Sequence, residues 1–173
     1  MKERGDAIVL IGFMGAGKSS VGRMLARMTG LPRFDTDEMV AARLGLTVSE
    51  IFETKGEETF REVETAALRE LANKRGAIIT TGGGILLRAQ NADLVRQLGT
   101  VVHLEADEAT LFRRINRRRT RPLLRTENPR ASLTELLRVR LPLYRAAADI
   151  QVDTSFLSHA EVAKKILNQI ENR

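Results

Sequence analysis

The 173-residue sequence contains no cysteine and no tryptophan, and it has only two histidines. Without cysteine, the chain cannot form disulfides, thiolate metal sites or iron–sulfur clusters, and it has no cysteine nucleophile. His103 and His159 are too far apart in the sequence to form a metal-binding pair on one helix. The apolar run at 7–11 is too short for a signal peptide or a membrane span. These absences favour a cytoplasmic enzyme or binding module without a membrane partner.

The charge balance is basic, with 28 Lys and Arg against 22 Asp and Glu, a net charge of +6 and a pI near 10.3. Clustered cations bind nucleic-acid backbones by releasing counterions, but they suit small anionic ligands equally well. Net charge alone therefore leaves both kinds of partner open.

Short apolar runs alternate with helical patterns along the whole chain. Runs at 7–11, 31–35, 77–81, 100–104 and 149–152 resemble buried parallel strands. Strand–helix–strand alternation implies right-handed crossovers and an open parallel sheet covered by helices on both faces. With 43% hydrophobic residues and no linker-like stretch, we expect one α/β domain over residues 1–173.

Three capping boxes predict helix starts, at Thr47–Glu50, Ser132–Glu135 and Ser158–Glu161. The helical stretch at 47–74, interrupted at Gly56, is longer than a crossover needs, so we expect the region at about 37–75 to cover a ligand pocket. Pro142 is expected either to kink or to end the helix that begins at Ser132.

Residues 12–19, Gly-Phe-Met-Gly-Ala-Gly-Lys-Ser, match the phosphate-loop pattern directly after a predicted strand and before a predicted helix at 20–28. The glycines let backbone amides turn toward phosphate oxygens, and the helix adds its positive end. Lys18 would bridge the β- and γ-phosphates, and the Ser19 hydroxyl would bind Mg²⁺. The spacing favours ATP or GTP binding over a ligand-free turn.

Asp35 and Asp37 follow the second predicted strand, at the sheet edge where α/β proteins bind ligands. Alternate residues of extended chain point the same way, so both carboxylates could face the phosphate loop. One would hold Mg²⁺ through water, and the other would orient an acceptor hydroxyl or take its proton. The alternative makes Asp37 the N-cap of a helix at 38–44 and Asp35 a turn residue.

Arginines and glycines form three further candidate groups. Arg61 has acids at i−4, i−3 and i+3, so when considered alone it is interpreted as a surface arginine. Arg140, when considered alone, is interpreted as a residue with a structural role. Gly82, Gly83 and Gly84 follow a predicted strand and favour close approach of a ligand. The segment at 113–130 is a candidate mobile lid, and six of the nine residues at 113–121 are arginine, namely residues 113, 114, 117, 118, 119 and 121.

The arginine run has three interpretations. It is a solvated helix face, a nucleic-acid patch, or a lid that brings Arg121 onto the transferring phosphoryl group and Arg114 onto the adenine face. Phe112 is the lone aromatic residue near the run, so the interleaved aromatics suited to base stacking are missing. We therefore expect no nucleic-acid partner.

In their order along the chain, these motifs resemble those of the shikimate kinases. The resemblance covers essentially the whole sequence and rests on residues 12–19, Asp-Thr-Asp at 35–37, Gly-Glu-x-x-Phe-Arg at 56–61, Gly-Gly-Gly at 82–84, Arg-Pro-Leu-Leu at 121–124 and Arg-x-Pro-Leu-Tyr at 140–144. It implies phosphorylation of the 3-hydroxyl of shikimate by MgATP, in the route to aromatic amino acids. It also implies a five-stranded parallel sheet of the nucleoside-monophosphate-kinase type, and we expect a cytoplasmic monomer.

The resemblance also assigns roles to residues. Asp37 would bind the acceptor hydroxyl and act as the base, and Lys18 and Arg121 would contact the phosphates as the other catalytic residues. Arg61, Arg140 and the three glycines would bind shikimate, and Ser19 and Asp35 would hold Mg²⁺. ATP would be bound by Gly15, Ala16, Gly17, Lys18, Ser19, Ser20, Arg114 and Arg121.

Two competing functions use the same residues. A related small-molecule kinase, such as a gluconate kinase, shares the phosphate loop and the sheet. Arg61, Arg140 and the three glycines argue against it, because a different acceptor should require a different set of residues to bind its carboxylate. A nucleotide-binding regulatory module or an RNA-binding protein would instead use the arginine run.

Overall fold

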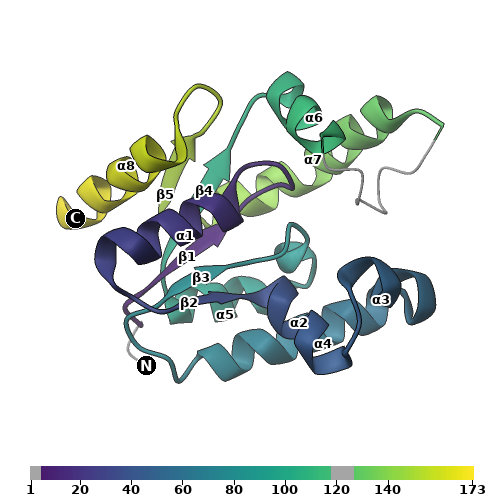
Figure 1. Ribbon diagram of the computed structural model, residues 1–173, viewed down its shortest axis with the longest axis horizontal. Coiled ribbons are helices and arrows are strands. Elements are labelled where there is room, and N and C mark those ends of the chain that lie inside the picture. The colour runs from purple at the N-terminus through teal and green to yellow at the C-terminus, as the bar shows by residue number, and fades with distance from the viewer. Residues whose placement is uncertain (1–4, 118–126) are drawn as a thin grey trace.

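The computed structural model describes residues 5–117 and 127–173 and has a five-stranded parallel sheet at its centre (Figure 1). The strand order is β2-β3-β1-β4-β5, so the chain crosses over between neighbouring strands. The five predicted strands and their parallel arrangement are confirmed, with bounds of Ala7–Ile11 for β1, Arg33–Asp35 for β2, Ile78–Thr80 for β3, Gly99–Glu105 for β4 and Ile150–Asp153 for β5.

Helices cover both faces of the sheet and make the predicted three-layer α/β/α fold. In Figure 1, α1 and α8 pack side by side on one face, while α5 and α7 lie on the other. None of the helices within residues 5–117 and 127–173 combines the length and apolar character needed to cross a bilayer. The helices are α1 (Lys18–Thr29), α2 (Thr36–Leu44), α3 (Val48–Thr54), α4 (Gly56–Leu71), the 3₁₀ turn η1 (Ile85–Leu87), α5 (Ala89–Leu98), α6 (Glu108–Asn116), α7 (Pro129–Ala147) and α8 (His159–Glu171).

The sheet register brings the candidate motifs to one edge. β1 is central and fully buried, with Leu10 opposite Thr80 of β3 and Ile11 opposite His103 of β4. On the other side of β3, Asp35 of β2 lies opposite the same Thr80. Because parallel strands end at the same edge, the phosphate loop after β1, the acidic pair after β2 and the glycines after β3 converge there.

The helices of the 37–75 region have a small apolar cluster of their own. It consists of Val40 of α2, Ile51 of α3 and Phe60 of α4, and it is separate from the main core around the sheet. We call it the acceptor-side cluster, because its helices belong to the region expected to bind the acceptor. All three side chains are buried, and Phe52 packs against Phe60 with ring centroids 4.9 Å apart. The helices α2, α3 and α4 are thus held to one another by their own contacts.

Two of the three predicted capping boxes are confirmed, at Thr47 for α3 and at Ser158 for α8. The prediction at Ser132 is wrong, because α7 begins one turn earlier. Asn128 caps it by accepting from the Ala131 amide, and Pro129 fits the first helical position, where no amide hydrogen is required. α7 also does not end at Pro142, since the helix continues to Ala147.

Candidate active site

Two cavities meet at the carboxyl edge of the sheet. One cavity, which we call the nucleotide-side cavity because it borders the phosphate loop, has a volume of about 330 Å³ and is also lined by residues of α6 and α8. The other, which we call the acceptor-side cavity, is lined by α3, α4, the glycine turn and Arg140. Met14, Asp37 and Gly83 line both cavities, so these residues mark the place where groups bound in the two cavities would meet.

The phosphate loop turns sharply between β1 and α1. Gly15 and Gly17 have φ angles of +82° and +98°, in the left-handed region that glycine adopts without strain. Gly17 is the N-cap of α1 and has no side chain to cap it, so the first amides of the helix are left to bind an anion. Lys18 is buried, and its Nζ donates to the carbonyls of Gly12 at 2.6 Å and Phe13 at 2.9 Å.

Residues from outside the phosphate loop support it, and one of them, Thr154, was not selected by sequence analysis. The Thr154 hydroxyl, on the segment after β5, donates to the Ala16 carbonyl at 3.1 Å. Arg114 donates to the Thr154 carbonyl at 2.7 Å and to the Gly15 carbonyl at 3.3 Å, and burial lowers its pKa. His159 lines the same cavity. The capping box at Ser158 predicted the start of α8, but no local pattern indicated that this start lies beside Gly17.

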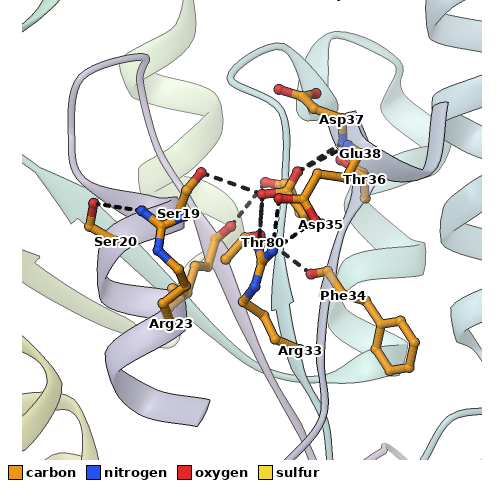
Figure 2. Close-up of polar contacts among 12 residues, drawn as sticks. Ser19, Ser20, Arg23, Arg33, Phe34, Asp35, Thr36, Asp37, Glu38 and Thr80 are labelled. Atoms are coloured by element: carbon orange, nitrogen blue, oxygen red, sulfur yellow. Dashed lines mark hydrogen bonds and ion pairs between the residues drawn. The ribbon is translucent and has the colours of Figure 1, made fainter. Parts of the chain in front are cut away.

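Asp35, the first residue of the acidic pair, accepts hydrogen bonds from several elements of the site (Figure 2). Its Oδ1 accepts from the amides of Asp37 at 3.0 Å and Glu38 at 3.4 Å, which makes Asp35 the N-cap of α2. Its Oδ2 accepts from the hydroxyls of Ser19 at 3.4 Å and Thr80 at 2.7 Å. The alternative in which Asp37 caps the helix is therefore wrong.

Asp37 reaches the site for a different reason than the sequence suggested. The strand ends at Asp35, so the alternation of extended chain does not apply, and Asp37 lies instead in the first turn of α2. In Figure 2 its carboxylate points away from the contacts around Asp35. It lines the nucleotide-side cavity together with Lys18 and Ser19.

Arg61 is not a surface arginine. It is 6% exposed, and its Nη1 binds Glu64 at 2.8 Å while its Nη2 binds Glu57 at 3.0 Å. Glu58, the third acid near it in sequence, pairs with another arginine. A Cβ on Gly84 would lie 2.2 Å from Arg61 Nη2, so a larger residue at 84 would require this guanidinium to move.

Arg140 enters the acceptor-side cavity from α7 and is 4% exposed. Its Nη1 donates to the Gly83 carbonyl at 3.3 Å, and its guanidinium lies over the Phe13 ring. The Tyr144 hydroxyl donates to the same carbonyl. The ring centroids of Tyr144 and His103 lie 5.2 Å apart, and burial lowers the pKa of His103 to about 4. Tyr144 thus holds the glycine turn in place beside Arg140.

Arg61, Arg140, Asp37 and the three glycines therefore line one cavity, and Lys18, Ser19 and Asp37 line the other. Of the other candidates, Gly15, Gly17, Ser20 and Arg114 line the nucleotide-side cavity, whereas Ala16 and Asp35 line neither cavity. Arg121 lies outside the described residues, as do residues 118–120 and 122–126 of the predicted lid. Around these gaps, Arg113 and Arg114 belong to α6 and Arg130 to α7.

A family model for shikimate kinase matches residues 14–171, nearly the whole chain. The chain belongs to the shikimate kinase family. It is 49% identical over 159 residues to a shikimate kinase from Thioalkalivibrio sulfidiphilus, covering 92% of this chain and 84% of that one. A solved structure of shikimate kinase from Acinetobacter baumannii, in complex with shikimate, is 39% identical with a TM-score of 0.93 and covers 98% of this chain and 95% of that chain.

A gluconokinase from Sinorhizobium meliloti is also similar in structure, covering 98% of this chain and 94% of its own, with a TM-score of 0.58 and 18% identity. At that identity the likeness concerns the fold alone. The expected resemblance to shikimate kinases is thus confirmed at the level of the family, while the predicted roles of individual residues stay predictions.

In this member of the shikimate kinase family, Glu64 makes stability depend on pH. Its side chain is fully buried, and burial raises its pKa to about 7 despite the attraction of Arg61. Glu64 therefore binds its proton more tightly in the folded protein than in the unfolded chain, where the pKa is near 4.5. The resulting stabilisation is complete below pH 4.5 and is lost as the pH rises to about 7.

We expect wild type to lose about 2 kcal/mol of unfolding free energy relative to Glu64→Gln between pH 5 and pH 8. The glutamine keeps the shape of the side chain but has no proton to titrate. Urea denaturation of both proteins at several pH values measures the difference, and parallel pH profiles would contradict it.

Proposed function

We propose that the protein transfers the γ-phosphoryl group of ATP to the 3-hydroxyl of shikimate, giving shikimate 3-phosphate and ADP. The observation that carries the proposal is that Asp37 and Gly83 line both cavities, one bordered by the phosphate loop and the other by two buried arginines. The donor phosphate and the acceptor hydroxyl would meet there, as direct transfer requires. This activity is the phosphorylation step in the route to aromatic amino acids.

On the nucleotide side, the amides of residues 15–20 and the Lys18 ammonium would bind the phosphates. Lys18 lines this cavity, and its Nζ donates to two carbonyls of its own loop. Arg114 would face the adenine, since it lines the same cavity and is fixed by its bonds to Thr154 and Gly15. Arg121, placed by the family motif alone, would contact the phosphates.

The residues present fit Mg²⁺ bound together with ATP. The Ser19 hydroxyl and the Asp35 carboxylate, 3.4 Å apart, are oxygen donors of the kind that Mg²⁺ prefers. Mg²⁺ usually keeps several waters and is bound through one or two protein ligands together with phosphate oxygens. When bound, Mg²⁺ would neutralise charge on the phosphates.

On the acceptor side, Arg61 and Arg140 would bind the shikimate carboxylate. Guanidinium groups bind carboxylates with two parallel hydrogen bonds, which fixes orientation as well as position. With the acid anchored, the 3-hydroxyl would reach Asp37. Asp37 accepts the hydroxyl proton as the oxygen attacks the γ-phosphorus, and ADP leaves with the electrons of the broken P–O bond.

The proposal includes one domain over residues 1–173, with the segment at about 113–130 acting as a lid and the region at about 37–75 binding the acceptor. It also includes a monomer in the cytoplasm whose partners are ATP and shikimate, without nucleic acid or membrane. Closure of a lid would exclude water, which would otherwise compete with shikimate as the acceptor.

A coupled ADP-release assay tests the function. We expect ADP release at a normal kinase rate, about 1–100 per second, with shikimate, and at least about 100-fold less without it. Gluconate and other hydroxy acids serve as controls, because they present a carboxylate with hydroxyls at different positions. Equal turnover with gluconate, or no turnover with shikimate, would overturn the proposal.

A further inference from the structure

Arg33 binds two carboxylates that neighbour Asp37 in sequence, yet it belongs to neither cavity. It is the first residue of β2, and its side chain is 18% exposed. Its Nη2 donates to both oxygens of Glu38, at 2.8 and 2.7 Å, and its Nη1 donates to Asp35 Oδ2 at 3.2 Å (Figure 2). One planar guanidinium thus joins residues on both sides of Asp37, a geometry that lysine cannot reproduce.

The two carboxylates hold the start of α2. Asp35 is the N-cap, and Glu38 lies in the first turn, where its charge also favours the positive end of the helix. Asp37 is located between them. Any rotation of this first turn would therefore move Asp37, and the contacts of Arg33 oppose such a rotation from outside the cavities.

Asp37 and Glu64 both approach the backbone of the glycine turn closely. A Cβ on Gly82 would lie 2.6 Å from Asp37 Oδ1 and 2.4 Å from Glu64 Oε1, so both carboxylates pack tightly against the glycine backbone. Asp37 and Glu64 are like charges this close together, so they repel each other. Arg33 supplies positive charge on the strand side, while Arg61 supplies it on the opposite side through Glu64.

We propose that Arg33 is a positioning residue that clamps Asp35 and Glu38 and thereby fixes Asp37 for the acceptor hydroxyl. The inference rests on the proposed function, because it concerns the same phosphoryl transfer. Arg33 touches neither cavity, so its removal changes the turnover of the bound complex and leaves the binding of both substrates nearly intact. Asp35 keeps its bonds to Ser19, Thr80 and two amides without Arg33, so α2 still forms.

The test compares Arg33→Met, Arg33→Lys and a matched control, Arg43→Met. Arg43 lies on α2 and, like Arg33, pairs with a glutamate, but its partner is Glu70 and it stands at the far end of the helix from Asp37. We expect Arg33→Met to lower kcat by about 10–100-fold, the scale of a small misplacement of a reacting group. Arg33→Lys, which keeps the charge without the fork, should fall between Arg33→Met and wild type, and Arg43→Met should match wild type.

Two further measurements separate positioning from a general structural role. Calorimetric Kd values for shikimate and for MgADP should stay within about twofold of wild type in Arg33→Met. In an Asp37→Asn background, adding Arg33→Met should change the residual kcat by less than about twofold, because the group being positioned is already gone.

Three results would overturn the inference: an unchanged kcat in Arg33→Met, a loss confined to MgADP binding, or an equal loss of kcat in the presence and absence of Asp37. Lack of shikimate-dependent ADP release in the unmodified protein would instead overturn the proposed function, and the inference with it. Melting temperatures of all the variants show whether a loss of kcat merely follows unfolding.

Discussion

Replacing Asp37 by asparagine is expected to lower kcat by about 10²–10⁴-fold while changing the affinity for ATP by no more than about twofold. The amide has nearly the same shape as the carboxylate but cannot accept the proton of the acceptor hydroxyl. Asp37 lines the wall shared by the two cavities, so its loss affects the transfer step more than the binding of either substrate.

The fold should tolerate this substitution. The negative charge of Asp37 raises the pKa of the buried Glu64, after the larger effect of burial, so removing it relieves a repulsion within the site. Steady-state kinetics with each substrate varied, together with a melting curve, measure both effects. Asp93→Asn is the matched control, because Asp93 lies on the surface of α5, where it forms an ion pair with Arg96. Near-normal turnover of Asp37→Asn would remove Asp37 from the chemistry.

Replacing Arg140 by methionine is expected to raise the KM for shikimate by about 100-fold, with the KM for ATP within about twofold of wild type. A pair of hydrogen bonds to a charged group in a buried site accounts for a loss of this size. Arg140 donates to the Gly83 carbonyl, and the Tyr144 hydroxyl still occupies that carbonyl after the substitution. The glycine turn therefore keeps its support.

Arg61→Met provides the comparison, because the two arginines share a cavity but differ in their partners. Removing Arg61 leaves the buried Glu64 without its ion-pair partner, at a cost of about 3–5 kcal/mol of stability unless Glu64 takes up a proton. We therefore expect Arg61→Met to lose both stability and shikimate affinity, whereas Arg140→Met loses mainly affinity. Thermal unfolding and shikimate titrations distinguish them, and equal losses of ATP and shikimate affinity in Arg140→Met would contradict its assignment.

The parts that local sequence determines were predictable. The five strands follow from short apolar runs, and the phosphate loop follows from glycine spacing between a strand and a helix. The start of α7 is set by Asn128 as the N-cap and Pro129 at the first helical position, and the Ser132 capping-box pattern lies one turn inside the helix.

The buried state of Arg61 was not predictable from its neighbours in sequence. Three nearby acids suggest a solvated helix face, and only the packing of α4 against the glycine turn places the guanidinium beside Gly84. Arg33 and Glu38 are five residues apart in the sequence, and the hydrogen bonds between them likewise depend on how the chain turns between β2 and α2. Contacts of this kind are set by tertiary packing, which residue patterns do not record.

The acceptor-side cluster of Val40, Ile51 and Phe60 has an evolutionary consequence. Phe60 belongs both to this cluster and to the wall of the cavity beside Arg61, while the nucleotide half depends on the main core around the sheet. Substitutions within this cluster therefore repack the wall of the acceptor-side cavity without entering the main core. Under the proposed function, such an architecture would let a lineage exchange one alcohol for another while keeping its phosphate donor.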